Sequence, residues 1–139
     1  MTPNAVAAIL DARLFHLLAR ILIATAFLVP GVMQAVHFHG ALGEFGHFNL
    51  NPPTAYVAAS IVTLLAGSAL VIAGGRLTWL GAGALGIYTG LTIFIVHHVW
   101  TMHGDQAVSE LHTVLGHISM IGGLMAVAIL EHARGNRAS

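Results

Sequence analysis

The chain has 139 residues, of which 57% are hydrophobic and 7% charged, with a formal net charge of zero and no cysteine. Soluble domains carry about 25% charged residues, so this composition excludes a water-soluble globule and indicates one membrane domain over residues 1–139, with lipid and not nucleic acid around it. Without cysteine, the chain itself supplies no disulfide, thiolate nucleophile or iron–sulfur ligand.

Four apolar stretches predict four membrane-spanning helices, since a span needs about 20 apolar residues. We expect these spans at about residues 20–36, 56–73, 77–99 and 107–130, with an amphipathic turn over residues 5–18 before the first. This opening segment lacks the basic start of a secretory signal. The predicted fold is therefore an all-α integral membrane four-helix bundle with antiparallel neighbours.

All basic side chains lie on one side of this topology. The five arginines fall before span 1, between spans 2 and 3, and after span 4: Arg13, Arg20, Arg76, Arg134 and Arg137. Positively charged loops stay in the cytoplasm, so we expect an N-in/C-in protein of a bacterial or archaeal inner membrane.

Eight of the ten histidines fall at the opposite face. Imidazole binds copper, zinc and iron, and it carries protons near neutral pH. The pattern thus predicts a metal centre or a proton relay at the outer face. The candidate ligands are His37, His39, His97, His98, His112 and His117. Asp105 and Glu110 are candidates to orient those ligands or transfer protons.

Small residues at helical spacing suggest which of these histidines point inward. Span 3 carries Gly83, Gly86, Gly90 and His97 on one stripe, and span 4 carries His112, Gly116, Ser119, Gly123 and Ala126 on another. Membrane helices approach one another along such stripes, so we expect His97 and His112 to face the bundle interior. A second hypothesis places haem b between facing helices, with His97 and His117 as axial ligands.

Short motifs in all four spans resemble the DoxX family of small four-helix membrane proteins. The motifs are Ala19-Arg20-Ile21-Leu22, Phe27-Leu28-Val29-Pro30-Gly31, Leu64-Leu65-Ala66-Gly67-Ser68-Ala69-Leu70, Gly74-Gly75-Arg76, His97-His98-Val99-Trp100 and His117-Ile118-Ser119-Met120-Ile121-Gly122-Gly123-Leu124. The resemblance implies a role in membrane redox complexes, including subunits of thiosulfate:quinone oxidoreductases.

Three positions depart from the pattern that the resemblance leads us to expect. Gln34 stands for a lysine, Thr63 for a glutamate and His117 for an asparagine, while His97 and Trp100 carry over. The interior thus has fewer charges and more imidazole.

We therefore expect a redox-associated membrane protein, an oxidoreductase or a subunit of one, with a histidine-rich copper, zinc or iron centre at its outer face. A quinone and partner proteins, or a second copy of the chain, are the expected partners. The alternative is a scaffold subunit without a cofactor that holds a larger membrane complex through its glycine-lined faces.

Overall fold

The computed structural model describes residues 2–97 and 99–138, and within them the chain forms α-helices and no strand. The helices are α1 (Asn4–Asp11), α2 (Arg13–Val36), α3 (Phe38–His47), α4 (Pro53–Ala73), α5 (Thr78–Ile95) and α6 (Gly104–Ala138). Short 3-10 turns lie at Gly75–Leu77, before α5, and at Val99–Thr101, before α6. The all-α prediction is confirmed.

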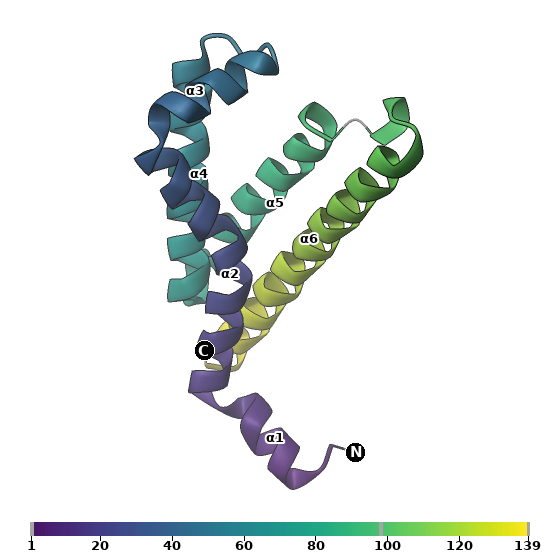
Figure 1. Cartoon of the computed structure of the whole chain (residues 1–139). Coiled ribbons are helices and arrows are strands. Elements are labelled where there is room, and N and C mark those ends of the chain that lie inside the picture. The colour runs from purple at the N-terminus through teal and green to yellow at the C-terminus, as the bar shows by residue number, and fades with distance from the viewer. Residues whose placement is uncertain (1, 98, 139) are drawn as a thin grey trace.

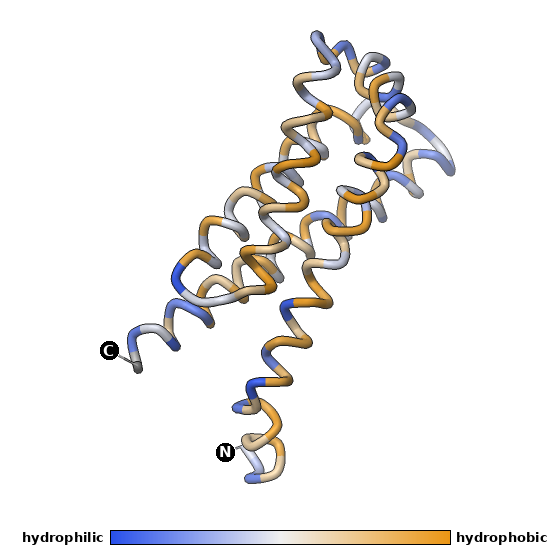
Figure 2. Tube along the Cα trace, turned by 90° about the vertical axis from the view of Figure 1, so that its left-hand side faces the viewer, coloured by the Kyte–Doolittle hydropathy of each residue, from blue (hydrophilic) through white to orange (hydrophobic). Residues whose placement is uncertain are grey.

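Four segments are long and apolar enough to cross a membrane, as predicted. They are Arg13–Val36, Pro53–Ala73, Gly75–Thr101 and Gly104–Asn136. Figure 2 shows that hydrophilic positions gather toward the two ends of the molecule and that the helices between them are largely hydrophobic. The last segment extends well beyond the predicted residues 107–130, because its polar ends remain helical.

Two further helices make the molecule more than a simple four-helix bundle. The amphipathic turn expected over residues 5–18 is broken at Ala12, which separates α1 from α2. The connection between the first two predicted spans contains a second further helix, α3, which packs against α4 and buries Ala41. Figure 1 shows α3 folded over the upper end of α4 and α1 projecting from the lower end.

The spanning helices pack mainly on their neighbours in sequence: α2 on α4, α4 on α5, and α5 on α6. Their shared core holds Ala24, Phe27, Leu64, Val71, Ala82, Leu85 and Leu124. Helices α2 and α6 touch more sparsely. In Figure 1 the four helices lie close together at the lower end, whereas α5 and α6 diverge from α4 at the upper end. The bundle is therefore closed below and open above.

Glycine sets the close approach of α4 to α5, but at positions other than those expected. A Cβ on Gly67 would lie 2.8 Å from Leu85, and a Cβ on Gly81 would lie 2.7 Å from the carbonyl oxygen of Gly67. By contrast, a Cβ on Gly83, Gly86 or Gly90 would meet nothing within 4 Å. The predicted span 3 stripe is wrong, because a seven-residue repeat defines a line along a helix but not the neighbour that it faces.

The span 4 stripe is correct at one point only. A Cβ on Gly123 would lie 2.8 Å from Ile23 of α2, whereas one on Gly116 would meet nothing within 4 Å. His112, expected in the bundle interior, is exposed. Helices α2 and α6 meet near their lower ends, so the upper part of the stripe has no neighbour to pack against.

Candidate functional site

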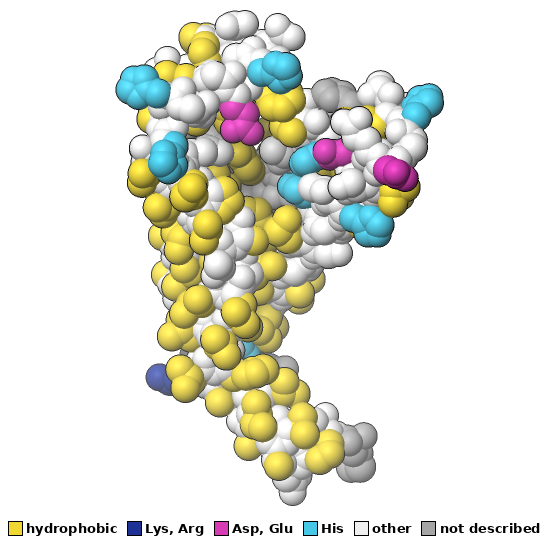
Figure 3. All heavy atoms as spheres, in the orientation of Figure 1, with side chains coloured by type: hydrophobic (Ala, Val, Ile, Leu, Met, Phe, Trp, Pro, Cys, Tyr) yellow, Lys and Arg dark blue, Asp and Glu magenta, His cyan; other side chains and the backbone are white. Residues whose placement is uncertain are grey.

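The open upper end of the bundle contains a cavity of about 630 Å³. It is lined by residues of α2, α3, α4 and α5 and by the segments that follow α3 and α5: Gln34, Glu44, Phe45, Phe48, Leu50, Tyr56, Ala59, Ser60, Thr63, Ala84, Ile87, Tyr88, Leu91, Thr92, Ile95, Val96 and His97. Figure 3 shows the hollow between the two upper lobes of the molecule. Its volume falls within the range of small-molecule sites.

Three helices contribute a chain of hydrogen bonds to the wall of this cavity. The Oγ of Ser60 on α4 lies 2.7 Å from Oε1 of Gln34 on α2 and 2.9 Å from the hydroxyl oxygen of Tyr88 on α5. Ser60 is buried, at 4% exposure. Its single hydroxyl hydrogen serves one bond at a time, so when Ser60 donates to Gln34, the phenol of Tyr88 supplies the hydrogen of the other bond. The cavity therefore has a hydrogen-bonded polar group among apolar walls.

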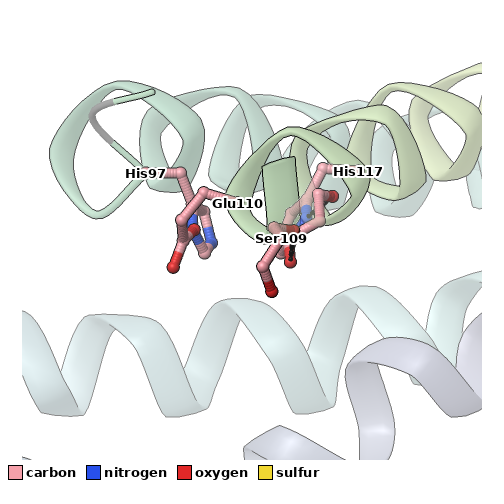
Figure 4. A network of polar contacts seen from close by, with 5 residues as sticks. His97, Ser109, Glu110 and His117 are labelled. Carbon is pink, nitrogen blue, oxygen red and sulfur yellow. Dashed lines mark hydrogen bonds and ion pairs between the residues drawn. The ribbon is translucent and has the colours of Figure 1, made fainter. Parts of the chain in front are cut away.

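His97 stands on the wall of the same cavity, just after the end of α5. Its Nδ1 lies 2.6 Å from Oε2 of Glu110 on α6, and both side chains are partly buried. A bond this short between an imidazole and a carboxylate is typical of charge-assisted pairs. Figure 4 shows both side chains pointing from the α5–α6 side toward the helices that face them.

His117 lies beside His97, and it is about two helical turns beyond Glu110 on α6. The two ring centroids are 5.0 Å apart, and the ring planes meet at 55°. Nδ1 of His117 is 2.8 Å from the carbonyl oxygen of Thr113 and donates a hydrogen bond to it. His97, His117 and Glu110 therefore form one polar cluster, which we call the imidazole pair and its carboxylate (Figure 4).

The other predicted ligands do not join this cluster. His37 and His39 are exposed at the junction of α2 and α3, and the ring of His112 is exposed with its Nδ1 bonded to the carbonyl oxygen of Val108. Asp105 is exposed in the first turn of α6. His98 lies outside the described residues. Among the residues that the structure does describe, no three His, Asp or Glu side chains are placed to hold a metal ion.

The separation of these histidines follows from the splayed helices. His37 and His39 lie at α2 and α3, whereas His97, His112 and His117 lie at the end of α5 and on α6. Figure 1 shows that α5 and α6 diverge from α4 at this end of the molecule, so the two groups lie on separate lobes. The cavity lies between the lobes. The members of the predicted ligand set that the structure describes are therefore spread over both lobes.

A haem between His97 and His117 does not fit this geometry. Axial imidazoles lie on opposite faces of a porphyrin, with the iron between them. Here the two rings come from the same side of the bundle and contact one another at a centroid distance of 5.0 Å. The space between them is too small for a macrocycle.

Sequence reasoning missed the polar chain of Gln34, Ser60 and Tyr88 as a site. The sequence does contain an indication of it, because a polar side chain inside an apolar span is energetically unfavourable unless it forms a hydrogen bond with another group. Three such side chains on three different spans are natural candidates for one another.

Four apolar helices define a multi-pass membrane protein, and a largely apolar cavity lies at its upper end. The family model DoxX matches residues 15–98, and the chain belongs to the DoxX family. No curated protein and no solved structure shows a significant match to the chain. The matched residues include the whole cavity wall, while the span 4 motif with His117 lies outside them.

Two of the three positions at which the chain departs from the expected family pattern face this cavity. Gln34 and Thr63 both line it, and Gln34 accepts the hydrogen bond of Ser60. The third, His117, lies against His97. The departures are thus gathered around one site, where Gln34 and Thr63 replace expected charges and His117 replaces an expected amide.

Proposed function

We propose that the chain is the quinone-binding membrane subunit of an oxidoreductase, with its site in the cavity between the two lobes. The observation that carries this proposal is the pairing of apolar and aromatic walls with two polar groups, the Ser60 chain and the His97–Glu110 pair. A quinone has the matching chemistry: a flat apolar ring with carbonyl oxygens that accept hydrogen bonds. Phe45, Phe48 and Tyr56 supply aromatic surface for such a ring.

The proposed reaction is the conversion of a quinone to a quinol, which requires two electrons and two protons. The electrons come from a redox centre of a partner protein in the complex. His97 has the chemistry to donate one proton to a carbonyl oxygen, and Glu110 holds the ring in place. Solvent that enters through the opening between the lobes supplies the second proton and reprotonates His97.

The membrane placement belongs to the same proposal. We place the protein in the inner membrane of a bacterium or archaeon, with both termini in the cytoplasm and neighbouring spans antiparallel. The support is the distribution of arginine, because all five lie in the segments assigned to one side. The cavity and eight of the ten histidines then face the outer side.

Titration of the detergent-purified protein with a short-chain ubiquinone tests the proposal by calorimetry. We expect saturable binding, and we expect His97→Ala to weaken it about tenfold, as for loss of a hydrogen bond to a charged group. His112→Ala is the matched control, because it removes an exposed imidazole from the same lobe. Equal affinity in the wild type and both His97→Ala and Ser60→Ala would overturn the proposed site.

A metal ion held by His97 and His117 is a second candidate function. In each ring Nδ1 is held, by Glu110 in one case and by the carbonyl of Thr113 in the other. Metal-binding histidines are commonly oriented in this way, with the second nitrogen as the ligand. The two Nε2 atoms could supply two ligands for copper, zinc or iron, and substrate or a partner would complete the coordination. A bound ion would supply Lewis acidity or one-electron chemistry.

Metal titration distinguishes the two candidates. If the imidazole pair binds a metal, Zn²⁺ or Cu²⁺ binds at one site per chain, and both His97→Ala and His117→Ala abolish it while His112→Ala does not. Quinone binding without metal binding favours the first function. Protein that binds neither favours the scaffold role, in which the cavity is filled by another subunit or a second copy of the chain.

A further inference from the structure

A second cleft lies at the opposite, lower end of the molecule and is unrelated to the proposed quinone site. It has a volume of about 840 Å³ and lies between the start of α2, the turn from α4 to α5, and the last turns of α6. Four arginines line it, Arg13, Arg20, Arg76 and Arg134, but Glu131 is its only acidic lining residue among those that the structure describes. The cleft is therefore strongly basic in a chain with no net charge.

Glu131 already forms a hydrogen bond and ion pairs with other groups of the chain. One of its carboxylate oxygens, Oε2, accepts a hydrogen bond of 2.7 Å from the amide of Gly75 and lies 3.7 Å from Nη1 of Arg20. The other, Oε1, lies 3.5 Å from Nη1 of Arg134. One carboxylate thus fixes two guanidinium groups and the turn between α4 and α5.

The four arginines carry many more hydrogen-bond donors than Glu131 engages. Each guanidinium carries five N–H groups, and Glu131 engages only one nitrogen of Arg20 and one of Arg134. The Nε of Arg20 is buried and has no hydrogen-bond partner. Arg13 and Arg76 are exposed and have no acidic side chain within ion-pair distance among the described residues. These unmet donors point to an anionic ligand with several oxygen atoms.

We infer that this cleft binds the phosphate group of an anionic phospholipid. Guanidinium groups match phosphate oxygens in pairs, and basic pockets between membrane helices bind lipid headgroups. The neighbouring surface favours a lipid over a free ion, because Trp79 lines the cleft and is 63% exposed beside the apolar span of α5. Tryptophan prefers the headgroup level of a bilayer. The acyl chains would then lie along the outer surface of the bundle.

Trp79 also provides the reporter for the test. The chain has two tryptophans, so Trp100→Phe leaves Trp79 as the only one. The full chain with this substitution, in dodecyl maltoside, is titrated with dihexanoyl phosphatidylglycerol, with dihexanoyl phosphatidylcholine and with inorganic phosphate, and the fluorescence is recorded. We expect a saturable change with phosphatidylglycerol and a much weaker response to the other two.

Variants then locate the site. Arg76→Gln and Arg13→Gln should each weaken phosphatidylglycerol binding about fivefold, the effect of one basic residue at a membrane surface. Gln106→Glu is the control, because it lowers the net charge by the same amount in the exposed first turn of α6, at the other end of the molecule. It should leave the binding curve unchanged.

Three results would overturn the inference. Equal responses to phosphatidylglycerol and phosphatidylcholine would mean that the signal reports only the micelle. Saturation by inorganic phosphate at the same concentration as the lipid would assign the cleft to a free ion. An equal loss in Gln106→Glu and the two arginine variants would reduce the effect to net charge.

Discussion

At the scale of single residues, one short contact determines the geometry of the site. Oε2 of Glu110 on α6 lies 2.6 Å from Nδ1 of His97, at the end of α5, and the ring of His97 in turn lies against the ring of His117. The carboxylate therefore joins the end of α5 to α6. Asp105, the other acidic candidate, is exposed at the first turn of α6. Its position suits a favourable interaction with the helix dipole.

We expect Glu110→Gln to destabilise the upper part of the molecule by about 1 kcal/mol, because a neutral amide forms a weaker bond to the imidazole than a carboxylate does. Thermal unfolding in detergent measures the change. The control is Glu44→Gln, which removes a carboxylate that is exposed on α3. If both variants unfold at the same temperature, the His97–Glu110 contact does not hold the lobe.

The residue scale also shows how far the sequence could predict the site. His97, His117 and Glu110 were all candidates, and the structure brings them together. His37, His39 and His112 were equal candidates on residue type, but they lie exposed. Residue type does not distinguish the two groups. His37 and His39 lie on the other lobe, and His112 lies on a face of α6 that is exposed.

At the scale of helices, the four spans were predictable because their signal is local. An uninterrupted apolar stretch of the right length is enough to identify a span. Helix α3 was missed although Phe38, Ala41, Leu42 and Phe45 follow the spacing of one helical face. These residues lie in the connection between the first two predicted spans, and the helix is shorter than a span and contains three glycines. The helical spacing of its apolar residues indicates α3 more reliably than its length or its glycines do.

Contacts between helices were harder to predict than the helices. The close approach of α4 and α5 depends on Gly67 and Gly81, whereas the sequence pattern favoured Gly83, Gly86 and Gly90. All five positions have the same residue type in the same apolar context. Only the relative rotation of the two helices decides which glycines meet a neighbour, and that rotation is a property of the whole packing arrangement.

We expect Gly67→Ala to destabilise the protein by roughly 1–3 kcal/mol, the usual cost of an overpacked contact. The added methyl would lie 2.8 Å from Cγ of Leu85, which is fully buried and has little room to move. Gly90→Ala is the matched control, since a methyl there meets nothing within 4 Å and alanine favours a helix. Thermal unfolding of both variants in detergent measures the difference, and equal stability would contradict the observed packing of α4 on α5.

At the scale of the whole molecule, polar chemistry is divided between the two ends. The lower end carries arginine and one glutamate in a cleft, and the upper end carries histidine, glutamate and a cavity. The apolar helices between them separate the two sites. The end-to-end division was predictable from the order of residues along four spans. The opening of the upper end was not, because it follows from the weak contact between α2 and α6.

This division predicts the orientation of the protein in a membrane, and cysteine labelling tests it. The chain has no cysteine of its own, so each introduced cysteine gives an unambiguous signal. Asn51→Cys and Gln106→Cys lie at exposed positions of the upper end, and Leu77→Cys lies at an exposed position in the turn before α5. We expect a membrane-impermeant maleimide to label the first two in intact spheroplasts and to label Leu77→Cys only after lysis. Labelling of Leu77→Cys in intact spheroplasts would reverse the orientation. The arginine cleft would then face away from the cytoplasm, and the cavity would open toward cytoplasmic partners.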